Sequence, residues 1–104
     1  MRRGELWWAN LPAPAGRRPV LLLSRDDAYA VRTLVTVAPL TTTVRAIPVE
    51  VGVGTADGLP KPCAINLDSL TTIPKALLAQ RIATLEPAKL AAVEKALRFA
   101  LALA

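Results

Sequence analysis

Proline and glycine divide the first 80 residues into short runs, and this punctuation restricts the possible folds more than any other feature of the chain. Proline cannot continue a strand ladder and glycine permits tight turns, so the segments between these residues must be short. Five of these runs, with a sixth further along the chain, are expected to be strands, and together they predict a small, mainly β fold, closed or half-closed as a barrel. The six are Glu5–Leu11, Pro19–Ser24, Arg32–Leu40, Ile47–Val53, Cys63–Leu70 and Arg81–Leu85.

The last quarter of the chain changes to a helical period. Apolar residues recur there at spacings of three and four, which predicts an amphipathic helix: Leu90, Val93, Leu97 and Leu101. Glu86 is the expected N-cap, Pro87 the first helical residue, and Leu85 and Leu90 stand at the positions of a hydrophobic staple. A further helical turn is expected at Pro74–Leu78.

The length of 104 residues suits one domain, spanning residues 1–104. Although 53% of the residues are hydrophobic, the longest stretch without a charge is the twelve residues of Thr33–Val44, whereas a spanning helix needs roughly 18–20 apolar residues. The N-terminus lacks the apolar run of a signal peptide, and the lone Cys63 cannot form an intrachain disulfide. We therefore expect a soluble, cytoplasmic protein without a membrane segment.

The charge balance favours polyanionic partners. Thirteen Lys and Arg residues stand against eight Asp and Glu residues, for a net charge of +5, and the chain has no histidine. Histidine is the most common metal ligand and the side chain best suited to proton transfer near neutral pH. Its absence argues against ordinary zinc chemistry and His-dependent catalysis. We expect no cofactor.

Arg17 and Arg18 follow a glycine-bearing loop and directly precede Pro19 and a strand. A guanidinium held at a strand entrance can bind a phosphate through two parallel hydrogen bonds. Alternatively, these are loop arginines that pair with Glu5 or with a neighbouring aspartate.

Thr41, Thr42 and Thr43 end another expected strand. Their hydroxyls can contact a phosphate, or they can hydrogen-bond their own backbone in a turn. Asp68 stands in an apolar run. One interpretation is a partly buried carboxylate with a shifted pKa, and the other is a charge on a strand edge that opposes aggregation.

Adjacent Trp7 and Trp8 must leave opposite faces of a strand. One can fill the core while the other meets solvent, a partner subunit or a nucleobase. Cys63, with no histidine to activate it, is expected to be a small buried residue.

Five segments in order resemble the MazF/PemK toxins of bacterial toxin–antitoxin systems. They cover nearly the whole chain: Arg2–Leu11, Arg18–Asp26, Val37–Thr42, Cys63–Ile73 and the helix at Leu85–Leu103. The resemblance implies an SH3-like β-barrel with a C-terminal α-helix, assembled as a homodimer. It also implies a metal-independent, sequence-specific endoribonuclease that cleaves single-stranded RNA to a 2′,3′-cyclic phosphate and a 5′-OH, and an acidic antitoxin protein that neutralises it.

The same resemblance transfers site residues by motif. The arginine of the Arg-Pro element falls on Arg18, the threonine at the strand end falls on Thr41, and an acidic position falls on Asp68. These three are the expected catalytic residues: Arg18 stabilises the phosphorane, Thr41 orients the phosphate and Asp68 is the candidate base. Four further residues are expected to bind RNA: Arg17, Arg25, Thr42 and Arg45.

The chain departs from the family pattern in two places. The Pro12–Arg17 loop is shorter than usual and lacks the carboxylate often found there, so no acidic residue lies between Glu5 and Asp26. Arg25 stands where the family often has asparagine, and there it would add a phosphate contact. A noncatalytic SH3-like module that binds nucleic acid or protein is the alternative function, because a fold alone does not determine activity.

Overall fold

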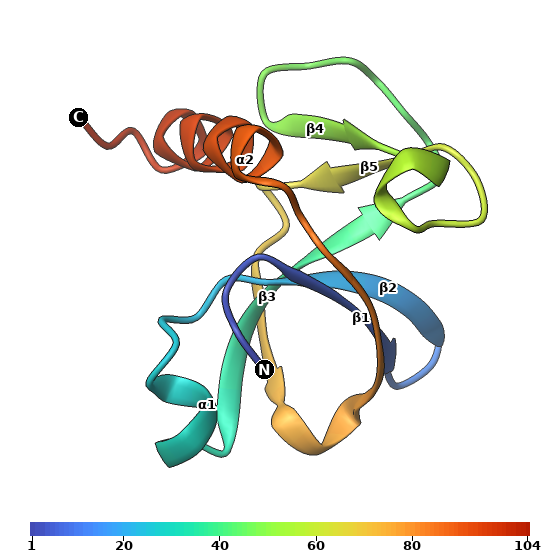
Figure 1. Ribbon diagram of the computed structural model, residues 1–104, viewed down its shortest axis with the longest axis vertical. Coiled ribbons are helices and arrows are strands. Elements are labelled where there is room, and N and C mark those ends of the chain that lie inside the picture. Colours follow the sequence, from blue (N-terminus) through green and yellow to red (C-terminus); the bar gives the residue numbers. More distant parts are fainter.

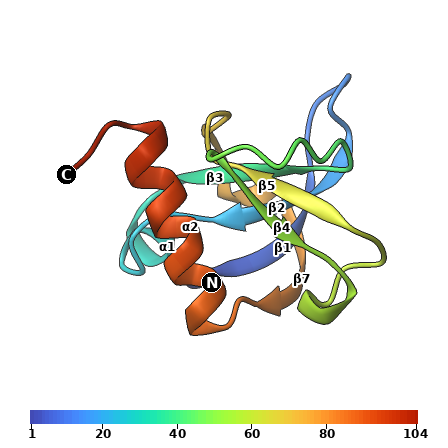
Figure 2. The same ribbon diagram turned by 90° about the horizontal axis from the view of Figure 1, so that it is seen from above.

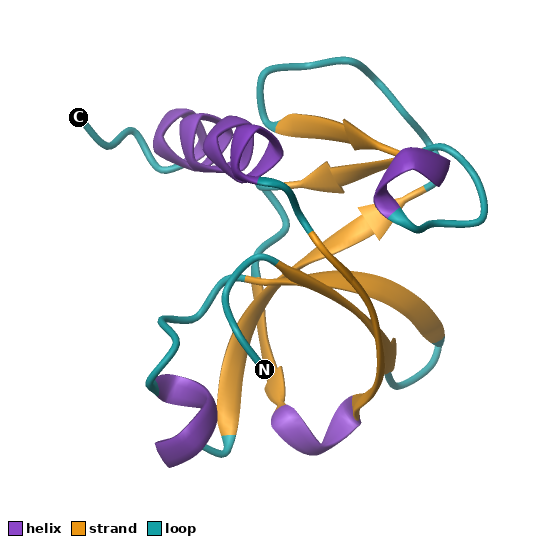
Figure 3. Cartoon of the chain, in the orientation of Figure 1, coloured by secondary structure: helices purple, strands orange, loops and turns teal.

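The computed structural model describes residues Met1 to Ala104 and is mainly β, with one long helix at its C-terminal end (Figures 1 and 3). Its strands are β1 (Glu5–Asn10), β2 (Arg17–Leu22), β3 (Leu34–Thr41), β4 (Glu50–Val53), β5 (Cys63–Asn66), β6 (Thr71–Pro74) and β7 (Leu78–Thr84). The helices are α1 (Ala28–Val31) and α2 (Pro87–Ala100), and single 3-10 turns occupy Thr55–Asp57 and Lys75–Leu77.

The seven strands form one strongly curled antiparallel sheet. Neighbouring strands follow the order β4-β5-β3-β2-β1-β7, and β6 also pairs with β3. The long β3 strand joins two groups: Leu34–Val37 pairs with β6, whereas Leu40 and Thr41 pair with β5. We call β1, β2, β6 and β7 the lower group of strands, and β4 and β5 the upper group. Figure 1 shows β3 passing from the lower group to the upper one. The expected half-closed, SH3-like barrel with a C-terminal helix is confirmed.

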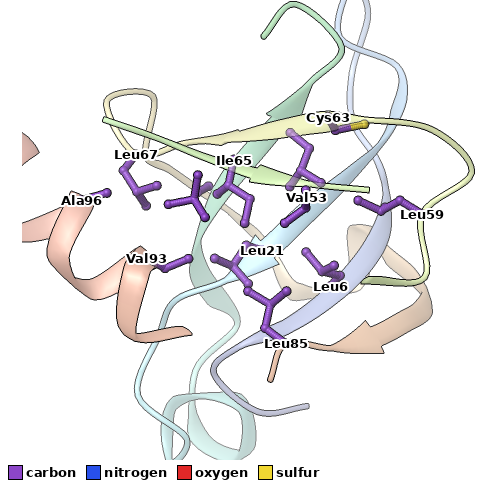
Figure 4. Packing of buried hydrophobic residues seen from close by; sticks show 13 residues of the cluster. Leu6, Leu21, Val53, Leu59, Cys63, Ile65, Leu67, Leu85, Val93 and Ala96 are labelled. Atoms are coloured by element: carbon purple, nitrogen blue, oxygen red, sulfur yellow. The ribbon is translucent and has the colours of Figure 1, made fainter. Parts of the chain in front are cut away.

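Strand β2 is buried on both faces, as its continuous apolar run predicts. Leu21 belongs to a cluster of 13 buried residues shared with β4, β5 and α2, whereas Val20 and Leu22 belong to a cluster of eight inside the lower group of strands. Figure 4 shows the larger cluster, with Leu21 near its centre. Strand β2 therefore lies between the two cores and contributes side chains to both.

Helix α2 packs across the strands of the upper group and covers the larger cluster (Figures 2 and 4). It begins as expected, with Glu86 at the N-cap, Pro87 in its first turn, and Leu85 and Leu90 packed in the same cluster. Val93 and Ala96 are buried, and Leu90 and Leu97 are partly buried against the larger cluster, so the predicted apolar stripe is confirmed except at Leu101. Leu101 lies past the end of the helix and is half exposed.

The expected strand Cys63–Leu70 is wrong, because the chain turns after Asn66. The Asn66 side-chain oxygen accepts a hydrogen bond from the Asp68 backbone N–H at 2.9 Å, which closes the local turn that asparagine favours. Two strands, β5 and β6, therefore replace one. Asp68 is exposed in this turn and is neither partly buried nor part of a strand edge.

Other boundaries move by a few residues. Strand β2 begins at Arg17, β4 begins only at Glu50, and β7 extends back to Leu78. The short helix α1 was not expected. No helix of the structure is long and apolar enough to span a membrane.

Removing the side chain of Leu21, which is 0% exposed, is expected to destabilise the protein strongly, because the cavity opens in the wall between the two cores. Leu21→Ala should lower the free energy of unfolding by about 2–5 kcal/mol, measured by urea denaturation. Val31→Ala is the matched control, since Val31 is 71% exposed, and its change should stay within about 0.5 kcal/mol. Similar losses for the two variants would contradict this packing.

Tyr29, the only tyrosine of the chain, offers a pH-dependent test of the smaller core. Burial, which disfavours the charged phenolate, raises the pKa of Tyr29 to about 12. Below pH 10 the phenol is protonated in both the folded and the unfolded chain, and its contribution to the free energy of unfolding is fully present. As the pH rises from 10 toward 12, only the unfolded chain ionises, so the free energy of unfolding should decrease. Absorbance at alkaline pH should show no ionisation until near pH 12 or unfolding; a transition near pH 10 in the folded protein would contradict this burial.

Candidate functional site

The candidate site lies where β2 begins and β3 ends. These strands pair antiparallel, with Val20 opposite Pro39 and Leu21 opposite Ala38. Continuing this register by two residues places Arg18 opposite Thr41, on the same face of the sheet. The ladder between two buried strands thus brings together two of the three expected catalytic residues.

A pocket of about 320 Å³ opens where these two strand ends meet. Four polar or charged side chains that the sequence analysis singled out line this pocket, together with residues of the loop before β5. The lining consists of Trp8, Arg17, Arg18, Pro19, Leu40, Thr41, Thr42, Pro60, Lys61 and Cys63. Arg17, Arg18, Thr41 and Thr42 therefore meet at one place.

The guanidinium of Arg18 is held by the loop between β1 and β2. Its Nε donates a hydrogen bond to the Ala15 carbonyl oxygen at 3.3 Å, and the residue is half-buried. This contact uses one N–H and leaves the two terminal nitrogens for a ligand, which suits bidentate binding of a phosphate. No carboxylate pairs with Arg18, so the alternative of a loop ion pair is wrong for this residue.

Arg17 stacks on Trp8. Its guanidinium carbon lies 5.0 Å from the centre of the Trp8 ring, within the range of a cation–π contact, and its Nη1 donates to the Asn10 side chain at 3.3 Å. Trp7 leaves the opposite face, as expected, and its Nε1 donates to Glu5 at 2.9 Å. Trp8 is therefore the tryptophan that lines the site.

The hydroxyl of Thr41 is oriented by the turn that follows it. Its oxygen accepts a hydrogen bond from the Thr43 backbone N–H at 3.1 Å. A hydroxyl that accepts one bond still has its own proton to donate. The turn interpretation is therefore confirmed for Thr41. Contact of its hydroxyl with a phosphate stays a prediction, and Thr41 lines the pocket where that contact would form.

Lys61 is the cation that the sequence analysis missed. It is exposed at the rim of the pocket, between Pro60 and Pro62, on a segment anchored by Leu59 at 3% and Cys63 at 6% exposure. The available signal was a lysine flanked by two prolines, which restrict the backbone. Cys63 is buried and free, as expected.

The pocket is electrostatically uncompensated. Its lining holds three cations and no acidic residue. The four ion pairs of the protein use other cations, namely Arg3, Arg45, Arg81 and Lys89. Positive charge without a protein partner marks this pocket as a site for an anionic ligand.

Three expected site residues lie outside the pocket. Strand β5 starts at Cys63, which lines the pocket, and Asp68 comes after its other end, in the exposed turn described above. Arg25 borders a separate hollow with Asp26 and Asp27. Arg45 pairs with Glu50 at 3.6 Å. The single chain therefore brings none of these three residues to Arg18 and Thr41.

Comparison with known proteins decides the family. Residues 2–101 match the family model described as "PemK-like, MazF-like toxin of type II toxin-antitoxin system". This chain belongs to that family. The MazF/PemK resemblance seen in the sequence is thereby confirmed, and with it the identification as an endoribonuclease toxin rather than a noncatalytic module.

Individual relatives of this toxin agree over nearly its whole length. The protein named "Probable endoribonuclease MazF5" of Mycobacterium tuberculosis is 40% identical over 99 residues, covering 94% of this chain and 90% of the relative. The structure titled "Mycobacterium tuberculosis toxin MazF-mt6" superposes with a TM-score of 0.88 at 36% identity, covering 96% of this toxin and 98% of that chain.

A second solved structure is titled "Endoribonuclease in complex with its cognate antitoxin from Mycobacterial species". It superposes with a TM-score of 0.87 at 29% identity and covers 100% of this toxin and 97% of that chain. Relatives of this toxin thus include one solved together with its antitoxin.

Proposed function

We propose that this toxin cleaves single-stranded RNA at a specific short sequence, without a metal, and that Arg18 and Thr41 form the reaction centre. The observation that carries the proposal is the pocket in which three unpaired cations and an oriented hydroxyl meet with no acidic residue. This arrangement suits a phosphodiester, which is anionic at every linkage.

The proposed reaction is attack of the ribose 2′-OH on the adjacent phosphorus. The new O2′–P bond forms as the P–O5′ bond breaks, giving a 2′,3′-cyclic phosphate and a 5′-OH. The 2′-OH loses its proton to a base and the leaving oxygen gains one, so charge concentrates on the phosphoryl oxygens in between. DNA lacks the attacking hydroxyl, which restricts the reaction to RNA.

Arg18 is proposed to stabilise that charge. Its terminal N–H groups are free of protein partners, and its Nε is fixed on Ala15, so the guanidinium is positioned before the substrate arrives. The permanently charged arginine can donate to the leaving oxygen but cannot serve as base. Thr41 donates its hydroxyl proton to a phosphoryl oxygen. Arg17 and Thr42 line the same pocket and are proposed to bind RNA.

The assignment of Asp68 as base, and of Arg25 and Arg45 as RNA contacts, stays a prediction. None of the three borders the pocket of the single chain. Asp68→Asn tests the first assignment: a base contributes about 10²- to 10⁴-fold to the rate. A loss of that size would support Asp68, whereas nearly unchanged cleavage would remove it from the mechanism.

We further propose that the toxin acts in the cytoplasm as a homodimer and is neutralised by an acidic antitoxin. The dimer is supported by large apolar side chains that one chain leaves exposed, including Phe99 in the last turn of α2 and Leu101 and Leu103 after it. The antitoxin proposal rests on the relative solved with its cognate antitoxin and on the unpaired cations of the pocket, which an acidic segment could cover.

The direct test is cleavage of a long single-stranded RNA in EDTA. The wild-type protein should cut at a short recurring sequence, and Arg18→Ala should lower the cleavage rate by about 10²- to 10³-fold, because preorganised charge is lost from the transition state. Circular dichroism should show that the variant stays folded. Intact RNA with the wild-type protein, or full activity of Arg18→Ala, would contradict the proposal.

Lys61 should contribute to binding rather than to chemistry, because it lies at the exposed rim. Lys61→Gln should raise KM, leave kcat unchanged, and reduce the slope of log affinity against log salt for single-stranded RNA by about 0.7. Lys95→Gln is the matched control, since Lys95 is exposed on α2 and borders no pocket. Equal slopes for the two variants would exclude Lys61 from the RNA path.

A further inference from the structure

Arg18 also borders a second hollow, which lies between the loop that follows β1 and the strands β3 and β6. This hollow has a volume of about 320 Å³. Besides Arg18, it is lined by Leu11, Pro12, Ala15, Pro39, Thr71 and Ile73. One arginine therefore lines two cavities, and neither the family comparison nor the reaction centre explains the second one.

The register of β6 explains which side chains enter this hollow. Thr71 pairs with Val37, and Ile73 pairs with Val35. Val35, Val37 and Ile73 belong to the core inside the lower strands, so Thr71 stands on the same face, one pair closer to the rim. Thr72 pairs with Thr36 on the opposite face, where the two hydroxyl oxygens lie 3.5 Å apart.

The chemistry of the second hollow differs from that of the first. Apart from Arg18 at its border, the only polar side chain in its lining is Thr71, and the other five residues are apolar. A second phosphate would find no additional cation there. A flat ring with apolar faces and a hydrogen-bonding edge fits this lining, and nucleobases have that character.

We propose that this hollow is a subsite for the base of a nucleotide next to the scissile phosphate, and that the Thr71 hydroxyl reads the edge of that base. The inference rests on the proposed cleavage at Arg18. With the phosphate on Arg18, the adjoining nucleotide needs to cross only one side chain to enter the hollow. Thr71 is thus a specificity-determining residue, whereas the pocket lined by Arg17 and Lys61 binds the charged phosphate backbone of the RNA.

The test compares Thr71→Val with Thr72→Val, two isosteric changes at neighbouring exposed residues on opposite faces of β6. Single-turnover cleavage is measured on short RNA oligonucleotides in which each base around the cut site is varied in turn. Thr71→Val should reduce discrimination by about 2- to 10-fold at one base position and leave the other positions unchanged, as expected for one lost hydrogen bond. Thr72→Val should discriminate like the wild type.

A blocking variant makes the result independent of that one hydrogen bond. Thr71→Trp should fill the hollow, and the rate should then no longer depend on whether the same nucleotide carries a base or is abasic. In the wild type, removal of that base should slow cleavage. The subsite would be overturned if Thr71→Val changed discrimination at no single base position, or if Thr71→Val and Thr72→Val changed it equally. A wild-type protein that leaves RNA intact would instead overturn the proposed function.

Discussion

The antiparallel ladder between β2 and β3 is the contact on which the rest of this toxin depends. Its pairs, Val20 with Pro39 and Leu22 with Val37, lie in the wall between two cores, so the side chains of β2 are buried on both faces. A slip of one residue would exchange those faces and expose one apolar set. The same pairing brings the start of β2 to the end of β3, where Arg18 and Thr41 line one pocket, which links the packing of the barrel directly to the geometry of the site.

The distribution of charge is consistent with this link. Arg3, Arg45, Arg81 and Lys89 are each paired with a carboxylate, whereas the three cations at the pocket have none. Neighbouring unpaired cations repel one another, which opposes folding and is relieved when an anionic ligand arrives. The pocket thus gathers three cations without a carboxylate partner where β2 begins and β3 ends, and Arg18 lines both this pocket and the apolar hollow.

Sequence reasoning predicted most strands of the barrel and the start of α2, because short apolar runs and proline positions are local signals. It placed Arg18 and Thr41 in one site through the ordered motifs of the family resemblance. It failed at one local turn and where tertiary contacts decide. Asp68 looked like part of a strand until the Asn66 side chain closed a turn. Lys61 carried no motif, and it joins the site only because Leu59 and Cys63 are buried on either side of it. The hollow beside Thr71 needs the register of β6, which no local pattern contains.

The central claim is that Arg18 and Thr41 act together on one phosphate. A double-mutant cycle of single-turnover cleavage rates for Arg18→Ala, Thr41→Ala and the double variant tests it most directly. If both side chains stabilise the same transition state, the double variant should be little slower than the slower single variant. Rate losses that multiply independently would contradict the account, because they would mean that the two residues do not share one phosphate.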